Sequence, residues 1–271
     1  MTPGTFASSR GLLLAFWLVG GLLLAFVLLP LLQMLASQAP SGLARVAAMA
    51  DVRAAIALSL EAAFATAALA ALLGVPLAYL LARVSFPGKG IVEAVVDLPL
   101  AIPHTVVGIG LLFVFGRTGW IGSAVNALTG YQFWGTRGGI IVAMLFVSIT
   151  YTVNAARVGF ESVDPRLEKV ARTLGAGPWG VFLRVTLPLA RRGVLTGLTL
   201  TFARAISEFG AVIVLTYYPM TAPVKIYDLF LQFGLNDSSA MAVLFLAVAL
   251  TLFILFRYLA YGRRARQRGP G

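Results

Sequence analysis

Six long apolar segments divide this chain, and they constrain its fold more than any other feature. They cover approximately residues 11–34, 55–83, 91–116, 138–160, 193–216 and 239–261. A helix needs about 20 apolar residues to cross about 30 Å of hydrocarbon, and each segment meets that requirement. With 59% hydrophobic and only 11% charged residues, the chain is far more apolar than a soluble domain. The sequence therefore predicts an all-α, polytopic membrane protein with six transmembrane helices.

The first apolar segment follows Arg10 and has some features of a secretory signal peptide. Its apolar part is longer than that of a signal peptide, and no clear small-x-small cleavage site follows it. We therefore expect this segment to be retained as a helix.

Basic residues are concentrated on one side of the predicted membrane. The chain has 21 Lys and Arg residues against 10 Asp and Glu residues, a balance that in a membrane protein indicates cytoplasmic loops rather than a nucleic-acid partner. With the N-terminus inside, most basic residues fall in inner connections, and the outer ones are Arg45, Arg53, Arg117, Arg137 and Lys225. This asymmetry predicts that both termini are cytoplasmic.

We divide the chain into three parts. Residues 1–53 form an N-terminal helix and an outer loop, and residues 54–262 form a core of five transmembrane helices. Residues 263–271 form a basic cytoplasmic tail, which suits a topology signal and a contact with anionic membrane lipid. The largest inner connection, residues 161–192, lies within the core.

This inner connection mixes charges with apolar residues at helical spacing, which a purely solvated loop would not need. Asp164 followed by Pro165 predicts a helix start, with Asp164 as the N-cap and Pro165 at the first helical position. The apolar face of this helix consists of Leu167, Val170, Ala171 and Leu174. The pattern predicts a short amphipathic helix that can present one face to a partner.

A turn and a second short helix follow. Gly175 and Gly177 allow the chain to stop and turn. The second helix is expected from Pro178 to about Val185, ending before Pro188.

The segment 168–188 resembles the cytoplasmic EAA loop of ABC importer permeases. That pattern reads Glu-Ala-Ala, three residues, Gly, nine residues, Ile, one residue and Leu-Pro. Gly175 matches the Gly, Val185 stands at the Ile, and Leu187 and Pro188 match Leu-Pro. The chain departs from the pattern where Lys169 occupies the Glu position, with Glu168 one place earlier.

The resemblance covers about residues 54–261 and implies the architecture of a type I ABC importer permease. In that family the loop is a coupling helix that fits a groove of the ATPase subunit. Its expected coupling residues here are Glu168, Lys169, Ala171, Leu174, Gly175, Gly177, Leu187 and Pro188. The replacement at Lys169 puts the usual acidic contact in question, but not the docking role.

The family also implies partners and a location. These are a second permease copy in a homodimer, two ABC ATPase subunits that bind ATP and Mg²⁺, and an extracytoplasmic oxyanion-binding protein. The location is a bacterial or archaeal plasma membrane. Transport proceeds by alternating access.

A second motif concerns the substrate. The segment Ser207–Ala211, followed by Tyr217–Tyr227, resembles permeases for molybdate and tungstate. Sulfate permeases are near relatives, and the three tetrahedral dianions share charge and shape. The expected substrate is therefore molybdate or tungstate, with sulfate or thiosulfate as the alternative.

The sequence contains no catalytic motif. A phosphate-binding P-loop needs a Gly five residues before its Gly-Lys pair. The only Gly-Lys pair in this sequence is Gly88-Lys89, and Arg83 occupies the position of that first Gly. There is no Gly-x-Ser-x-Gly or His-Glu-x-x-His motif, no cysteine, and a single histidine, so neither a nucleophile nor a metal site is expected. We expect a transport subunit without a cofactor, whose ATP hydrolysis occurs on the partner.

Polar groups within the apolar segments suggest the pathway. Arg204 and Glu208 lie four residues apart, and either neutralise each other structurally or line the translocation path or gate. Pro99 and Pro103 predict a break in the third helix, and non-helical backbone at membrane depth is tolerated where protein or water satisfies it. The proposed path or gate residues are Pro103, His104, Thr105, Arg204 and Glu208.

A rival class is a secondary transporter driven by an ion gradient. It predicts inverted repeats and acidic relays within the spans, and the two halves of this chain show no visible repeat. A channel or a passive scaffold leaves the patterned inner loop unexplained.

Overall fold

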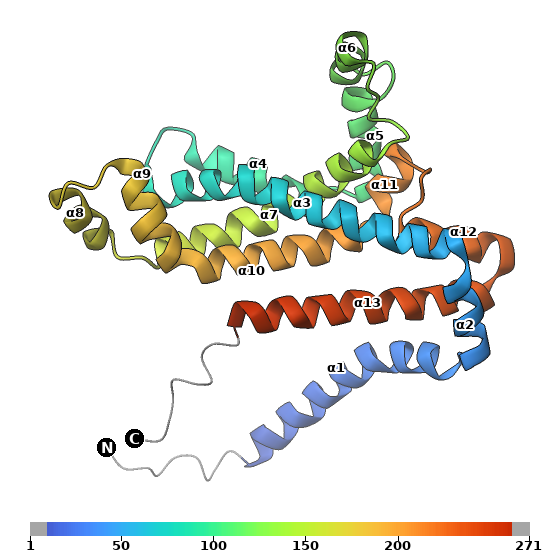
Figure 1. Ribbon diagram of the computed structural model, residues 1–271. Helices are drawn as coiled ribbons and strands as arrows, with labels where there is room; N and C mark the ends of the chain where they lie inside the picture. The colour runs from blue at the N-terminus through green and yellow to red at the C-terminus, as the bar shows by residue number, and fades with distance from the viewer. Residues whose placement is uncertain (1–9, 262–271) are drawn as a thin grey trace.

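A computed structural model describes residues 10–261, so the predicted basic tail at 263–271 lies outside the described residues (Figure 1). Every regular element in the described part is helical. In chain order the elements are α1 (Arg10–Ala36), α2 (Pro40–Ala48), α3 (Ala50–Arg83), α4 (Lys89–Ala101), α5 (His104–Phe115), α6 (Trp120–Thr129), α7 (Arg137–Glu161), α8 (Pro165–Thr173), α9 (Pro178–Val181), the π-helix η2 (Phe182–Thr186), α10 (Leu187–Ile206), α11 (Gly210–Leu215), α12 (Ala222–Phe233) and α13 (Leu235–Tyr261). The predicted all-α class is confirmed.

Within residues 10–261, four helices are long and apolar enough to cross a membrane. They are Gly11–Ala36, Ala50–Arg83, Arg137–Glu161 and Leu235–Phe256. A fifth span results if α4 and α5, which are bent by 115° at their junction, are counted together. The chain is thus a multi-pass membrane protein, with four or five candidate spans in its described part where six were predicted.

The third and fifth apolar segments differ from the prediction because each is broken. Ile102 adopts an extended conformation before Pro103, as expected for a residue that precedes proline, and this separates α4 from α5. In the fifth segment α10 ends at Ile206, and α11 begins only at Gly210. α10 also contains Arg191, Arg192 and Arg204, which make it less apolar than the four spanning helices.

The central packing unit consists of α3, α7 and α10, which lie side by side (Figure 1). α8 and α9 lie at one end of this unit, and α2 and α12 lie at the opposite end. By contrast, α1 has its main contact with α13, and its apolar side chains are exposed. Such a helix needs lipid or another chain around it.

The backbones of α7 and α10 approach closely at small residues. A Cβ atom at Gly193 would lie 2.5 Å from the Cα of Gly159 and 2.7 Å from the carbonyl oxygen of Ala155. A Cβ atom at Gly197 would lie 2.9 Å from the Cα of Thr152. Small residues at helix contacts permit this approach in membrane proteins, where packing rather than the hydrophobic effect holds helices together.

We predict that Gly193→Ala destabilises the protein by about 1–3 kcal/mol, because the added methyl group must push α7 and α10 apart. Thermal unfolding in detergent micelles measures the effect. Gly90→Ala in α4 is the matched control, since no atom lies within 4 Å of a Cβ there. Equal melting temperatures for the two variants would contradict the close contact.

Candidate functional site

The segment predicted to couple to an ATPase folds as expected at its first helix. The Asp164 side chain caps α8 by accepting a hydrogen bond from the backbone N–H of Arg166 at 2.9 Å, and Pro165 occupies the first turn. At the C-terminus Gly175 has a φ of +86°, and the N–H of Ala176 donates to the carbonyl of Ala171 at 3.0 Å. This is the hydrogen-bond pattern of a Schellman cap, which favours glycine.

The second helix differs from the prediction, because it does not end before Pro188. α9 continues into η2 and then directly into α10. The N–H of Leu187 donates to the carbonyl of Phe182, five residues back, so the backbone remains paired across the wider π turn. Pro188 then occupies the first turn of α10, directly after the π turn.

The α8–η2 segment carries an apolar ridge that no other part of the described chain covers. We define this ridge as the exposed side chains of Leu167, Val170, Leu174, Trp179 and Leu183. Leu174 is 83% exposed and Trp179 is 76% exposed. Several large apolar side chains exposed on one short segment are typical of an interaction site.

The predicted coupling residues differ in exposure. Lys169, Gly175, Gly177 and Pro188 are exposed, while Ala171 and Leu187 are half-buried. Glu168 is only 5% exposed, so it lies beneath the ridge rather than on it.

Glu168 has two partners that the sequence did not indicate. The Nε atom of Arg83 lies 2.9 Å from Oε1 of Glu168, and the hydroxyl of Thr186 donates to the same oxygen at 3.0 Å. Arg83 also donates to the carbonyl of Val163 at 2.8 Å. A pairing across 85 positions leaves no periodic signal in the sequence, because it depends on how α3 meets α8.

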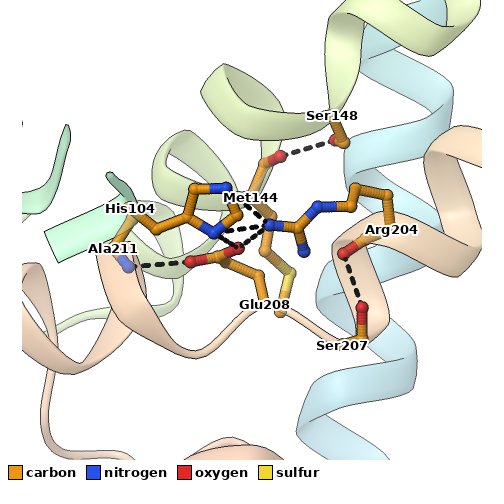
Figure 2. A network of polar contacts seen from close by, with 7 residues as sticks. All are labelled: His104, Met144, Ser148, Arg204, Ser207, Glu208 and Ala211. Carbon is orange, nitrogen blue, oxygen red and sulfur yellow. Dashed lines mark hydrogen bonds and ion pairs between the residues drawn. The ribbon is translucent and has the colours of Figure 1, made fainter. Parts of the chain in front are cut away.

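A second polar site lies where the two helix breaks meet (Figure 2). His104 begins α5 directly after the first break, while Arg204 lies in the last turn of α10 and Glu208 lies in the second break. The Nη2 atom of Arg204 lies 2.6 Å from Oε2 of Glu208, and Nδ1 of His104 lies 3.1 Å from the same oxygen. The tertiary structure thus joins three of the five proposed path residues in one cluster.

Polar contacts link Arg204 to both ring nitrogens of His104. Nη2 of Arg204 lies 2.6 Å from Nδ1 and 3.0 Å from Nε2 of His104. Arg204 can only donate, so a ring nitrogen of His104 that bonds to it must accept. Glu208 is fully buried and also accepts a hydrogen bond from the backbone N–H of Ala211 at 2.7 Å. This N–H lies in the first turn of α11, where backbone N–H groups have no partner within the helix.

The remaining proposed path residues lie beside this cluster. Pro103 and Thr105 are exposed on the same bent helix pair. Close packing of α5 on α11 holds the cluster in place, since a Cβ at Gly210 would lie 2.8 Å from the Cβ of His104. A Cβ at Gly108 would likewise lie 2.9 Å from the carbonyl oxygen of Ala211.

An aromatic pocket of about 720 Å³ opens at the far ends of α5 and α11. Its lining includes Tyr131, Tyr217 and Tyr218, and the guanidinium of Arg117 stacks 4.4 Å from the ring centre of Trp134. Aromatic residues that follow α6 and α11 in the chain therefore converge on one surface.

A charged network fixes this same end of the molecule. Lys225 lies 3.0 Å from Asp51 and 3.1 Å from Asp228, which also accepts the hydroxyl of Tyr217. Burial opposes the charge on Asp228, but hydrogen bonds from Lys225, Tyr217 and Gln232 outweigh burial and lower its pKa. Burial also opposes the charge on Lys225, yet the two carboxylates raise its pKa. The network is therefore ionised at neutral pH.

Within residues 10–261 no group of three or more His, Asp or Glu side chains is placed to hold a metal ion.

Comparison with known proteins decides the family. Residues 70–267 match the model of the family described as binding-protein-dependent transport system inner membrane component. The chain belongs to this family. Both polar sites of this inner membrane component lie within the matched residues.

Relatives of this inner membrane component are named as permeases of transport systems. The chain is 44% identical to the molybdate/tungstate transport system permease protein WtpB of Thermococcus kodakarensis, over 92% of this chain and 96% of the relative. It is 32% identical to the probable sulfate transport system permease protein cysT of Nephroselmis olivacea, over 86% of this chain and 84% of the relative.

A solved structure supports the fold of the inner membrane component. One chain of a bacterial alginate ABC transporter, crystallised with a pentasaccharide-bound periplasmic protein, aligns with a TM-score of 0.66. It has 19% identity and covers 91% of this chain and 95% of that chain. The type I ABC importer permease architecture expected from the sequence is thereby confirmed.

We predict that Glu208→Gln destabilises the inner membrane component by about 3 kcal/mol, because it leaves the guanidinium of Arg204, which is 20% exposed, without its carboxylate partner. The free energy of unfolding in mixed micelles measures this loss. Glu161→Gln is the matched control, because it removes a carboxylate from another i,i+4 pair, with Arg157, in which Glu161 is 45% exposed. That control should lose at most about 1 kcal/mol. Similar losses in both variants would contradict the buried ion pair.

Proposed function

We propose that this chain is the transmembrane permease subunit of an ATP-driven importer that translocates molybdate and tungstate by alternating access. The observation that carries the proposal is the 44% identity, along nearly the whole chain, to a molybdate/tungstate permease. The exposed apolar ridge supports the same function independently, because a membrane protein without a docking partner has no need of it.

Two ATPase subunits are the proposed partners of the ridge, one for each copy of a permease homodimer. ATP binding brings the two ATPases together and moves the α8–η2 segments with them, which opens the path outward. Hydrolysis returns the permease to the inward-open state. ATP drives this exchange only because the closed ATPase pair binds one permease conformation more tightly than the other.

The proposed orientation places α8 and α9 in the cytoplasm. The start of α1 and the end of α13 lie toward that same end of the molecule in Figure 1, which supports cytoplasmic termini. The aromatic pocket with Arg117 then faces outward, where a substrate-binding protein docks.

The His104–Arg204–Glu208 cluster is the proposed gate. An unpaired arginine at membrane depth would hold a dianion tightly, whereas transport requires binding weak enough for release. Glu208 lies 2.6 Å from Arg204 and neutralises its charge. The gate therefore offers hydrogen-bond donors without an unpaired positive charge that would bind the anion tightly. Separation of α5 from α11 would expose these donors to a passing oxyanion.

Sulfate or thiosulfate is the second candidate substrate, supported by the 32% identity to a sulfate permease. Proteoliposomes that contain this chain, its ATPase and its binding protein distinguish the candidates through uptake of labelled molybdate. Uptake should require ATP and be inhibited far better by tungstate than by sulfate. Uptake without ATP would instead favour an ion-coupled secondary transporter.

We predict that Gly175→Val reduces ATP-dependent uptake several-fold. The positive φ of Gly175 strains any L side chain, at a cost of about 1–2 kcal/mol, and this distorts the turn that presents the ridge. Gly177→Val is the matched control, because Gly177 has a φ of −68° and no atom lies within 4 Å of its Cβ position. Equal uptake by the two variants would show that the turn geometry is unimportant.

We also predict that Leu174→Asp abolishes co-purification of the ATPase while leaving the permease folded, since Leu174 is 83% exposed. Thr173→Asp is the control, because it introduces the same charge at the adjacent exposed position outside the ridge. Pull-down from detergent extracts measures the retained ATPase. Retention by the Leu174 variant would exclude the ridge as the docking surface.

A further inference from the structure

The contacts of Glu168 connect three separate elements through one carboxylate oxygen. Oε1 of Glu168 in α8 receives Nε of Arg83 from the end of α3 at 2.9 Å, and the hydroxyl of Thr186 at 3.0 Å. Thr186 is the last residue of η2, immediately before α10. A second guanidinium nitrogen of Arg83 donates to the carbonyl of Val163, in the link from α7 to α8.

This arrangement is buried, unlike the ridge on the other side of α8. The side chain of Arg83 is 13% exposed, and Thr186 is fully buried. Charge-assisted hydrogen bonds in such surroundings are stronger and geometrically more restrictive than those in water. Because Glu168 has both polar partners inside the chain, it is not available as a surface contact for an ATPase.

α8 has few other attachments to the spanning helices. Its main helix contacts are with α9 and η2, and it has no contact of comparable extent with α3 or α7. Its apolar side chains Leu167, Val170 and Leu174 point outward rather than into the permease core. The polar contacts of Glu168 are therefore the direct side-chain link from α8 to the C-terminal end of α3.

We propose that Arg83, Glu168 and Thr186 form a transmission joint that transfers the displacement of α8 to α3 and α10. This inference rests on the proposed function, in which an ATPase moves α8. Arg83, Glu168 and Thr186 act as positioning residues and touch neither substrate nor ATPase. Displacement of α8 then shifts the two helices to which the carboxylate is fastened, instead of being absorbed by the flanking turns.

The central test uses the double variant Arg83→Met/Glu168→Met in proteoliposomes with the ATPase and binding protein. Replacing both charges removes the joint without leaving an unpaired buried charge, so the fold should persist. The measured quantity is molybdate transported per ATP hydrolysed, with the amount of co-purified ATPase as a second readout. We expect the transport ratio to fall several-fold while ATPase binding stays unchanged.

Two further variants separate the joint from general stability. Thr186→Val removes only one hydrogen bond of the joint and should give an intermediate ratio. Arg83→Lys retains the charge but cannot bond to both Glu168 and the Val163 carbonyl as the arginine fork does. Its molybdate transported per ATP should therefore lie between that of the double variant and that of the unmodified chain. Glu161→Gln changes an ion pair outside the joint and should transport as much molybdate per ATP as the unmodified chain.

The possible results are distinct. A normal ratio in the double variant would overturn the transmission joint. Loss of ATPase binding in that variant would also overturn it, since it would make Glu168 part of the docking surface. Failure of the unmodified chain to import molybdate with ATP would instead reject the proposed function, and the joint with it.

Discussion

The close contact between α7 and α10 is the constraint on which the remaining structure depends. Gly159 and Gly193 let the two backbones meet, and α3 packs against both helices to complete the central unit. In a membrane this contact cannot rely on expulsion of water, so it depends on how well small residues fit together. The broken helices and the α8–η2 segment are arranged around this unit.

α10 links the two polar sites that we assign to function. Thr186, at its N-terminal boundary, bonds to Glu168, and Arg204, in its last turn, pairs with Glu208. A helix of 20 residues spans about 30 Å, so α10 extends from the proposed joint to the proposed gate. A displacement at one end therefore reaches the other through a continuous helix rather than through flexible loops.

The polar groups within the apolar segments also explain why helix breaks are tolerated here. A break leaves backbone N–H groups unpaired, and unpaired groups are costly in a membrane. Glu208 satisfies one of these groups, the N–H of Ala211, while its charge is balanced by Arg204. The carboxylate thus has a structural role as well as its proposed role in the gate, and the two readings of the Arg204–Glu208 pair do not exclude each other.

The sequence by itself determined the membrane class, the cap and turn of α8, and the family, because these depend on composition, local propensity and contiguous motifs. Asp164 and Gly175 act within a few residues of their own positions, so their roles could be predicted. Only the tertiary structure decided that Glu168 is buried against Arg83, that η2 carries the chain into α10, and that His104 meets Glu208. These features arise where helices distant in sequence pack together, and no local pattern encodes such contacts.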